Sequence, residues 1–111
     1  MVMIADNATE FNEVWLMARG GFKPTPAAPA IDFSKQAAIG FFLGEKPTAG
    51  YKAIPMRVIE TSPGNVEIHV QIGEPIGAAL QVISSPYFII SLAVGVEHVQ
   101  IISAGKPLMS I

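Results

Sequence analysis

The sequence has 111 residues and no cysteine, which excludes disulfide bonds, thiolate metal sites and a cysteine nucleophile. Its net charge of −2 gives no electrostatic basis for binding nucleic acid or anionic lipid. Half of the residues are hydrophobic and only 14% are charged, so apolar surface is left for an interface or an oligomer. We expect one domain over residues 1–111, and the low charge favours a homodimer.

The sequence predicts neither a membrane-spanning helix nor an export signal. Its longest apolar stretch, residues 87–96, is much shorter than the roughly 20 residues that cross a bilayer. The first ten residues lack a basic region, a long apolar run and a cleavage site of small residues, so they do not resemble a signal peptide. Both a cytoplasmic protein and the mature part of an exported one fit these features.

A helix is predicted over residues 7–20. Asn7 can cap its first turn, and Glu10 follows three residues later, as in a capping box. An apolar face with helical spacing follows, formed by Phe11, Val14, Trp15 and Ala18. The pair Gly20-Gly21 is expected to end the helix in the left-handed conformation. We expect Trp15 to lie in the core rather than to serve as a platform for a ligand.

Residues 22–30 contain three prolines and are predicted to be an extended connector. The alternative is a proline-rich ligand for a partner protein. A spacer that carries the chain across the domain is the favoured interpretation.

Most of the region 37–102 is predicted to form strands. Residues 37–43 are apolar on both faces, as in a central strand. Residues 51–60 contain Pro55, which indicates an edge or a bulge. In that strand we expect Ile54, Met56 and Val58 on one side, with Lys52, Ala53 and Arg57 nearer solvent.

The second half of the β region starts with a turn at 62–65, where proline and glycine take the central positions. Residues 65–72 alternate between apolar and polar, and therefore form a hairpin with one wet face. Residues 73–78 are predicted to be a loop. Further strands are expected over residues 79–84, 87–92 and 96–102, and a tail without regular structure over 103–111.

The predicted fold is mostly β (α+β). We expect an antiparallel sheet of five to six strands that curls into a small sandwich or half-barrel. The N-terminal helix would pack its apolar face on this sheet.

The pattern of reactive residues argues against an enzyme. His69 and His98 alternate with apolar neighbours in predicted strands, which places them on the surface. No candidate nucleophile has a base and an orienting group beside it, and neither histidine belongs to a zinc-binding motif. Lys46 precedes Gly50, the reverse of the order in a phosphate-binding loop. We expect no catalysis, no metal and no cofactor.

The stretch GEKPTAGYKA, residues 44–53, can be a turn or a recognition site. Pro47 sets φ for a turn, and Gly50 can take a positive φ. Thr48 could cap that turn, and Tyr51 could cover the edge of the sheet. As a recognition loop, the same segment would offer an aromatic ring at little entropic cost.

Two longer stretches, IDFSKQAAIGFFLGEKPTAGYKA and GEPIGAALQVISSPYFIISL, resemble the PrcB C-terminal domain family. The matching features are an Asp-Phe start at 32–33, the turn at 44–51, Glu74-Pro75 and the segment 84–87. Their order and spacing together carry the resemblance, which covers about residues 31–102. At the level of one loop, residues 47–51 are also similar to a loop of chagasin-type cysteine-protease inhibitors.

The resemblance implies a bacterial, non-catalytic companion of a subtilisin-like serine protease. We therefore expect a protein-binding domain that is associated with a protease or modulates it. The candidate contact residues are Thr48, Gly50, Tyr51, Pro86 and Tyr87. One alternative is a domain that binds a small ligand or a peptide in a cleft beside the sheet. The other is a self-associating structural module that uses the edge strand near Pro55.

Overall fold

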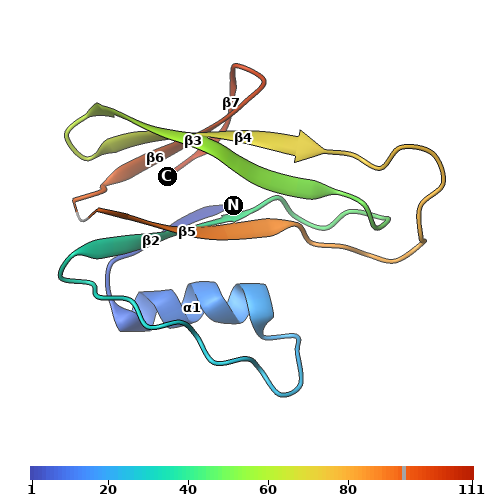
Figure 1. Cartoon of the computed structure of the whole chain (residues 1–111), viewed down its shortest axis with the longest axis horizontal. Helices are drawn as coiled ribbons and strands as arrows, with labels where there is room; N and C mark the ends of the chain where they lie inside the picture. The colour runs from blue at the N-terminus through green and yellow to red at the C-terminus, as the bar shows by residue number, and fades with distance from the viewer. Residues whose placement is uncertain (94) are drawn as a thin grey trace.

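A computed structural model describes residues 1–93 and 95–111 of the chain as three stacked layers (Figure 1). Helix α1 forms the first layer, a three-stranded sheet the second and a four-stranded sheet the third. The elements in chain order are β1 (Val2–Ala5), α1 (Ala8–Arg19), β2 (Gln36–Phe42), β3 (Lys52–Ser62), β4 (Asn65–Gly73), β5 (Tyr87–Ala93), β6 (His98–Ser103) and β7 (Lys106–Ser110).

The strands form two sheets, ordered β1-β2-β5 and β3-β4-β6-β7. All neighbouring strands are antiparallel except β4 and β6, which run parallel. A mostly β fold with one helix is confirmed, and β2 is central as expected. The prediction of one antiparallel sheet of five to six strands is wrong, because seven strands divide between two sheets that face each other.

The strand predictions were wrong at three places. β1 pairs with β2 although no strand was expected before the helix. β7 pairs with β6 in the predicted tail, where Pro107 is tolerated because β7 is an edge strand. Residues 79–84 contain no strand, and only an isolated bridge joins Ser84 to Lys46. β1 reaches β2 across the helix and the connector, whereas β6 and β7 form a hairpin around the turn Ala104-Gly105. Pairing with a neighbouring strand therefore decided these places at both long and short sequence separation.

The main core fills the space between the two sheets. Phe41 of β2 and Phe88 of β5 lie in contact there, with their ring centroids 5.1 Å apart. The buried residues of this core come from both sheets: Val2, Ile39, Phe41, Val66, Ile68, Val70, Phe88, Val99 and Ile101. The predicted alternation in β4 is therefore confirmed, since its apolar side chains point inward.

A smaller core holds α1 against the other face of the three-stranded sheet. Phe11 and Val14 are buried there together with Ala5 and Ala38, and Trp15 packs against the cluster. Gly40 permits this contact, because a Cβ atom on it would lie 2.7 Å from Val14 Cγ1. The expected packing of the helix is thus confirmed, and Trp15 is half-buried against this core rather than inside it.

The ends of α1 follow the sequence prediction only at the start. Asn7 Oδ1 accepts a hydrogen bond of 2.9 Å from the Glu10 amide, as an N-cap does. The C-terminal prediction is wrong, because Gly20 keeps a right-handed φ of −64° and donates to the Leu16 carbonyl. The Trp15 indole then donates to the Pro26 carbonyl at 2.8 Å and ties the connector 22–30 to the helix.

A bulge in β3 changes which side chains face the core. Pro55 pairs with Val70, but Arg57 already pairs with the preceding residue of β4, so Met56 is the extra residue. Before the bulge Ala53 packs against the core and Ile54 is exposed, which is the reverse of the predicted assignment. After the bulge Val58 lies opposite buried Ile68, as the predicted face requires.

The ends of the molecule are set by this topology. The β2–β3 and β4–β5 connections and the C-terminal end of α1 lie together at one end (Figure 1). The β3–β4 turn and the start of α1 lie at the other end. In the described part of the chain, no helix combines the length and the apolar character that crossing a membrane requires.

Candidate functional site

Two connections that are distant in sequence form one loop pair at the same end of the molecule. The Lys46 amide donates to the Ser84 carbonyl at 2.7 Å, and the Ser84 amide returns a bond of 3.0 Å to Lys46. The Leu43 amide donates to Pro86, and the Ala49 amide to Leu80. Residues 43–51 and 74–86, which we call the loop pair, therefore behave as one structural unit.

Thr48 and Gly50 hold the loop pair together. The Thr48 carbonyl accepts a hydrogen bond of 2.7 Å from the Ser84 hydroxyl, whereas the Thr48 hydroxyl donates to the adjacent Ala49 carbonyl. Gly50 has a φ of +95°, and a Cβ atom on it would lie 2.9 Å from Pro75 Cβ. Both residues serve the internal geometry of the loop pair in this structure.

Tyr51 is the tyrosine whose hydroxyl is unpaired among the described residues. Its half-buried ring lies 5.7 Å from Lys46 Nζ, at the distance of a cation–π contact. Within residues 1–93 and 95–111, its hydroxyl has no hydrogen-bond partner. The hydroxyl is therefore available to a partner or to water.

Tyr87 is held by the helix layer. Its ring stacks on Phe42 at 5.9 Å, and its hydroxyl accepts a hydrogen bond of 3.3 Å from Arg19 Nη1. The Arg19 guanidinium also lies over the rings of Trp15 and Phe22. This arrangement gives the side chain of Tyr87 a clear structural role.

A groove of about 460 Å³ brings three of the five predicted contact residues together. It runs between the start of β3 and the start of β5, each of which is an edge strand of its own sheet. Its lining residues are Tyr51, Lys52, Ala53, Ile54, Ser84, Ser85, Pro86 and Tyr87. Thr48 and Gly50 lie outside this lining, in the loop that supports it.

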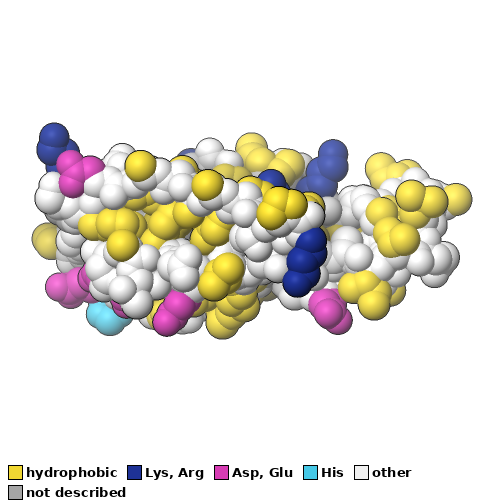
Figure 2. Space-filling view, turned by 90° about the horizontal axis from the view of Figure 1, so that it is seen from below, with side chains coloured by type: hydrophobic (Ala, Val, Ile, Leu, Met, Phe, Trp, Pro, Cys, Tyr) yellow, Lys and Arg dark blue, Asp and Glu magenta, His cyan; other side chains and the backbone are white. Residues whose placement is uncertain are grey.

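The loop pair also presents apolar side chains that sequence reasoning missed. Ile76 is 99% exposed, and Leu80 and Ile83 are exposed by 73% and 72%. Figure 2 shows hydrophobic side chains gathered on the projecting end of the molecule that the β4–β5 connection forms. The signal in the sequence was the uncharged run 75–86, which was interpreted in part as a strand.

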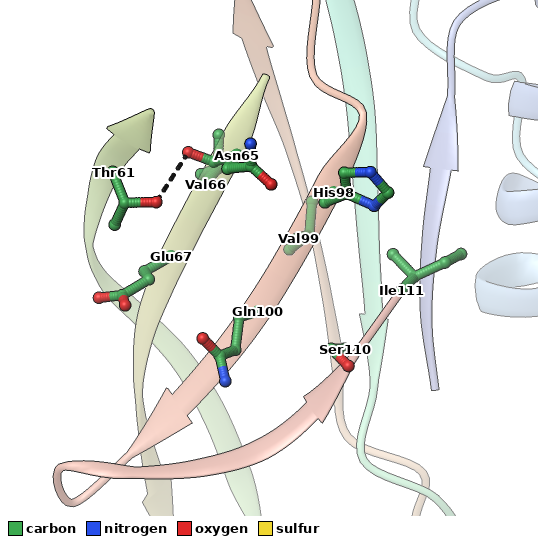
Figure 3. A pocket seen from close by; sticks show the side chains of 9 residues that line it. All are labelled: Thr61, Asn65, Val66, Glu67, His98, Val99, Gln100, Ser110 and Ile111. Carbon is green, nitrogen blue, oxygen red and sulfur yellow. Dashed lines mark hydrogen bonds between the residues drawn. The ribbon is translucent and has the colours of Figure 1, made fainter. Parts of the chain in front are cut away.

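A second hollow, of about 430 Å³, lies over β4, β6 and β7 at some distance from the loop pair (Figure 3). Glu67 and Gln100 project from neighbouring strands at its wall, and His98 lies close to Ile111. No feature of the sequence indicated this hollow, because β7 was not expected.

The two histidines are well separated. His69 of β4 has its Nε2 atom 3.1 Å from Glu67 Oε1. His98 of β6 lies opposite Asn65, which precedes His69 by four residues in β4. At about 3.3 Å per strand residue, this offset places the two positions roughly 13 Å apart. In the described part of the chain, no three His, Asp or Glu side chains form a group that could hold a metal ion.

Comparison with known proteins gives one family. A family model described as PrcB C-terminal matches residues 37–93, which include β3, β4, β5, the whole loop pair and all of β2 except Gln36. No curated protein and no solved structure gives a significant match to the chain. The similarity to chagasin-type inhibitors is not shown by these comparisons.

Proposed function

Because the chain belongs to the PrcB C-terminal family, we propose that it is a non-catalytic protein-binding domain of a protease complex. The family itself suggests association with such a complex. Binding of a protein partner, modulation of a serine protease and the absence of catalysis are parts of the proposal.

The observation that carries the proposal is the exposed apolar side of the loop pair. Three large aliphatic side chains, Ile76, Leu80 and Ile83, are each more than 70% exposed on a segment without charge. Exposed apolar groups that cluster on one projection are typical of protein contact sites. Tyr51, in the same loop pair, adds an aromatic ring with an unpaired hydroxyl, and aromatic residues are enriched in interfaces.

The test is affinity isolation from the source organism followed by quantitative binding. The tagged chain is used to capture partners, and each captured protein is purified and titrated against it. A subtilisin-like serine protease is titrated in parallel. We expect Ile76→Ser and Ile83→Ser each to lower the affinity for the partner at least about tenfold, as substitutions at interface hot spots do.

The control is Leu108→Ser, since Leu108 on β7 is also partly exposed but lies outside the loop pair. All three variants should keep the melting temperature of the parent within a few degrees, because they replace exposed side chains. Equal affinity of the parent and both isoleucine variants for every partner would contradict the proposed surface.

A second pair of variants separates recognition from turn structure. Tyr51→Phe removes a hydroxyl without an internal partner and should leave stability within about 0.5 kcal/mol. Thr48→Ala removes only the bond to Ala49. If the loop contacts the partner, each change should cost about 0.5–1.5 kcal/mol of binding free energy. Unchanged affinity in both variants would reduce this segment to a turn between two strands.

The non-catalytic part of the proposal has its own measurement. Purified protein should hydrolyse neither peptide nor ester substrates, with or without added zinc. Turnover that disappears in His69→Ala or His98→Ala would show that one of these histidines is catalytic.

A second candidate function is the binding of a small ligand or a peptide. The observation that favours it is the groove, whose lining includes both Tyr51 and Tyr87. Apolar walls with a few polar groups are usual in ligand sites.

A further inference from the structure

The groove beside Tyr51 lies on the open side of the sandwich, between two strands that have free edges. β3 is the first strand of its sheet and β5 the last of the other, so each lacks a strand partner on its outer side. Residues 51–54 and 84–87 form the two walls. Four residues of an extended chain span about 13 Å, so the groove matches a short extended segment.

The wall formed by residues 84–87 offers unpaired backbone groups. Ser84 uses its amide and carbonyl on Lys46, and the Pro86 carbonyl accepts from Leu43. Ser85, between them, makes no backbone hydrogen bond with the described residues. Because successive residues of an extended chain direct these groups to opposite sides, Ser85 directs its amide and carbonyl away from the segment that contains Lys46. A strand added at this edge would satisfy them.

The charges around the groove favour an acidic occupant. Lys52 lines the groove and Lys46 lies against the ring of Tyr51, while no carboxylate belongs to the lining. The only ion pair among the described residues joins His69 to Glu67, so neither lysine has a carboxylate within 4 Å.

The distribution of charge over the rest of the molecule also favours a negatively charged occupant of the groove. At the groove end, Arg19, Lys23, Lys46 and Lys52 outnumber Glu45 and Glu74, although the whole chain carries −2. Figure 2 shows most of the visible lysine and arginine side chains toward that end. Carboxylates such as Asp6 and Glu60 lie toward the opposite end of the molecule.

From these features we propose that the groove binds an extended, acidic segment of the partner protein by addition to the free strand edge. A carboxylate of the segment contacts Lys46 and Lys52, its backbone pairs with Ser85, and an apolar side chain packs on Ile54 and Pro86. This inference rests on the proposed function, since it names the chemistry of the partner segment that the domain recognises.

The test uses a library of random octapeptides displayed on phage, selected against the intact chain. We expect enrichment of peptides that combine aspartate or glutamate with β-branched residues. A selected peptide is then synthesised with a fluorescent label and titrated. Its affinity should fall at least about tenfold in Lys46→Glu/Lys52→Glu, and should fall with added salt.

Lys106→Glu is the matched control, because Lys106 begins β7 on the far edge of the four-stranded sheet. Backbone pairing is tested on the peptide itself and so does not depend on the folding of a variant. N-methylation of alternate peptide bonds should abolish binding in one register and be tolerated in the other. Tolerance in both registers would overturn addition to the strand edge.

Three other outcomes would overturn the proposal. They are the absence of an enriched peptide, enrichment of neutral or basic sequences only, and equal binding by the double lysine variant. A dimer of the parent that dissociates in the double lysine variant would show that a second copy fills the groove. If the purified partner binds but peptides do not, the proposed function stands and only this inference fails.

Discussion

At the scale of single residues, Gly44 and Gly50 make the clearest comparison in the loop pair. Both hold a positive φ, +98° and +95°, which side chains with a Cβ atom resist. A Cβ atom on Gly44 would meet nothing within 4 Å, whereas one on Gly50 would meet Pro75 at 2.9 Å. Strain acts at both positions, but close packing acts only at Gly50.

The predicted consequence is a difference between two matched variants. Gly44→Ala should lower the free energy of unfolding by about 1 kcal/mol through backbone strain alone. Gly50→Ala should lower it by about 2–3 kcal/mol, because overpacking against Pro75 adds to the strain. Chemical denaturation of both variants measures the difference. Equal losses would mean that the contact with Pro75 is not close in solution.

A second residue-scale prediction concerns Asp32. The Ser34 hydroxyl and the Ser34 amide, at 3.0 Å, donate to Asp32 Oδ1, and these hydrogen bonds, the hydroxyl first, hold the pKa of the Asp32 carboxyl below its ordinary value. The lowered pKa means that this interaction stabilises the fold above the ordinary carboxyl pKa and is lost as pH falls through the native value.

The measurement is an NMR titration of the Asp32 carboxyl in the parent and in Ser34→Ala. The pKa of Asp32 should rise toward its ordinary value when the hydroxyl is removed, because the largest cause of the shift is gone. The control is Ser85→Ala, which leaves this loop untouched. A pKa of Asp32 that is the same in Ser34→Ala as in the parent would contradict the assignment.

At the scale of elements, the start of α1 was visible in the sequence because its signals are local. The bond from the Glu10 amide to Asn7 closes within three residues. The Glu10 carboxylate accepts from the Asp6 backbone amide and from the Asn7 side-chain amide, not from the Asn7 backbone amide. The backbone half of the capping box is therefore displaced by one residue. Local side-chain geometry thus sets where the helix begins.

Asn7→Ala should therefore cost about 1 kcal/mol of unfolding free energy, since it removes the N-cap. The matched control is Asn12→Ala, on the exposed side of the same helix. This change should be neutral or slightly stabilising, because alanine has the higher helix propensity. Thermal melting of the two variants checks the prediction, and a loss at position 12 as large as at position 7 would refute it.

The strand β3 illustrates an element whose two halves obey different rules. The bulge at Met56 moves the inward face from Ala53 to Val58, so one alternation pattern cannot describe the whole strand. Beyond the bulge, Val58 and Ile59 are 41% and 36% exposed although they come from opposite faces. This half of β3 therefore extends beyond the area that the three-stranded sheet covers.

At the scale of the whole molecule, that uncovered half of β3 supports the prediction of a homodimer. β3 is an edge strand, and the exposed apolar side chains at and beyond its bulge include Met56, Val58 and Ile59. Such an edge is suited to pairing with a second copy. Light scattering at high concentration should give the mass of a dimer.

The variant Val58→Glu should restore a monomer, because it puts a charge on the uncovered edge. Val82→Glu is the control, since Val82 is a 52% exposed apolar residue of the loop pair. A monomer mass for the parent, or a dimer that survives Val58→Glu, would remove this prediction and the self-associating alternative.

The sequence by itself determined the features that depend on neighbours in the chain. The helix over residues 8–19, the central strand at 36–42 and the hairpin with Gly64 at a positive φ all follow from short-range patterns. The order of motifs between residues 37 and 93 was likewise sufficient to identify the family. The five predicted contact residues lie in one region of the structure, because both connections leave the sheets at the same end; that they contact a partner stays a prediction.

Only the tertiary structure decided the partners of the strands and the form of the candidate site. β1 and β7 exist because β2 and β6 supply hydrogen bonds, and residues 79–84 remain a loop because no strand lies beside them. The groove arises where edges of two different sheets meet. Pro55 indicated that β3 has an edge or a bulge, but no residue of β3 or β5 indicates that these two edges lie together. The physical reason is that a strand satisfies its backbone outside its own segment, so its neighbours, and the surfaces left without them, depend on the whole fold.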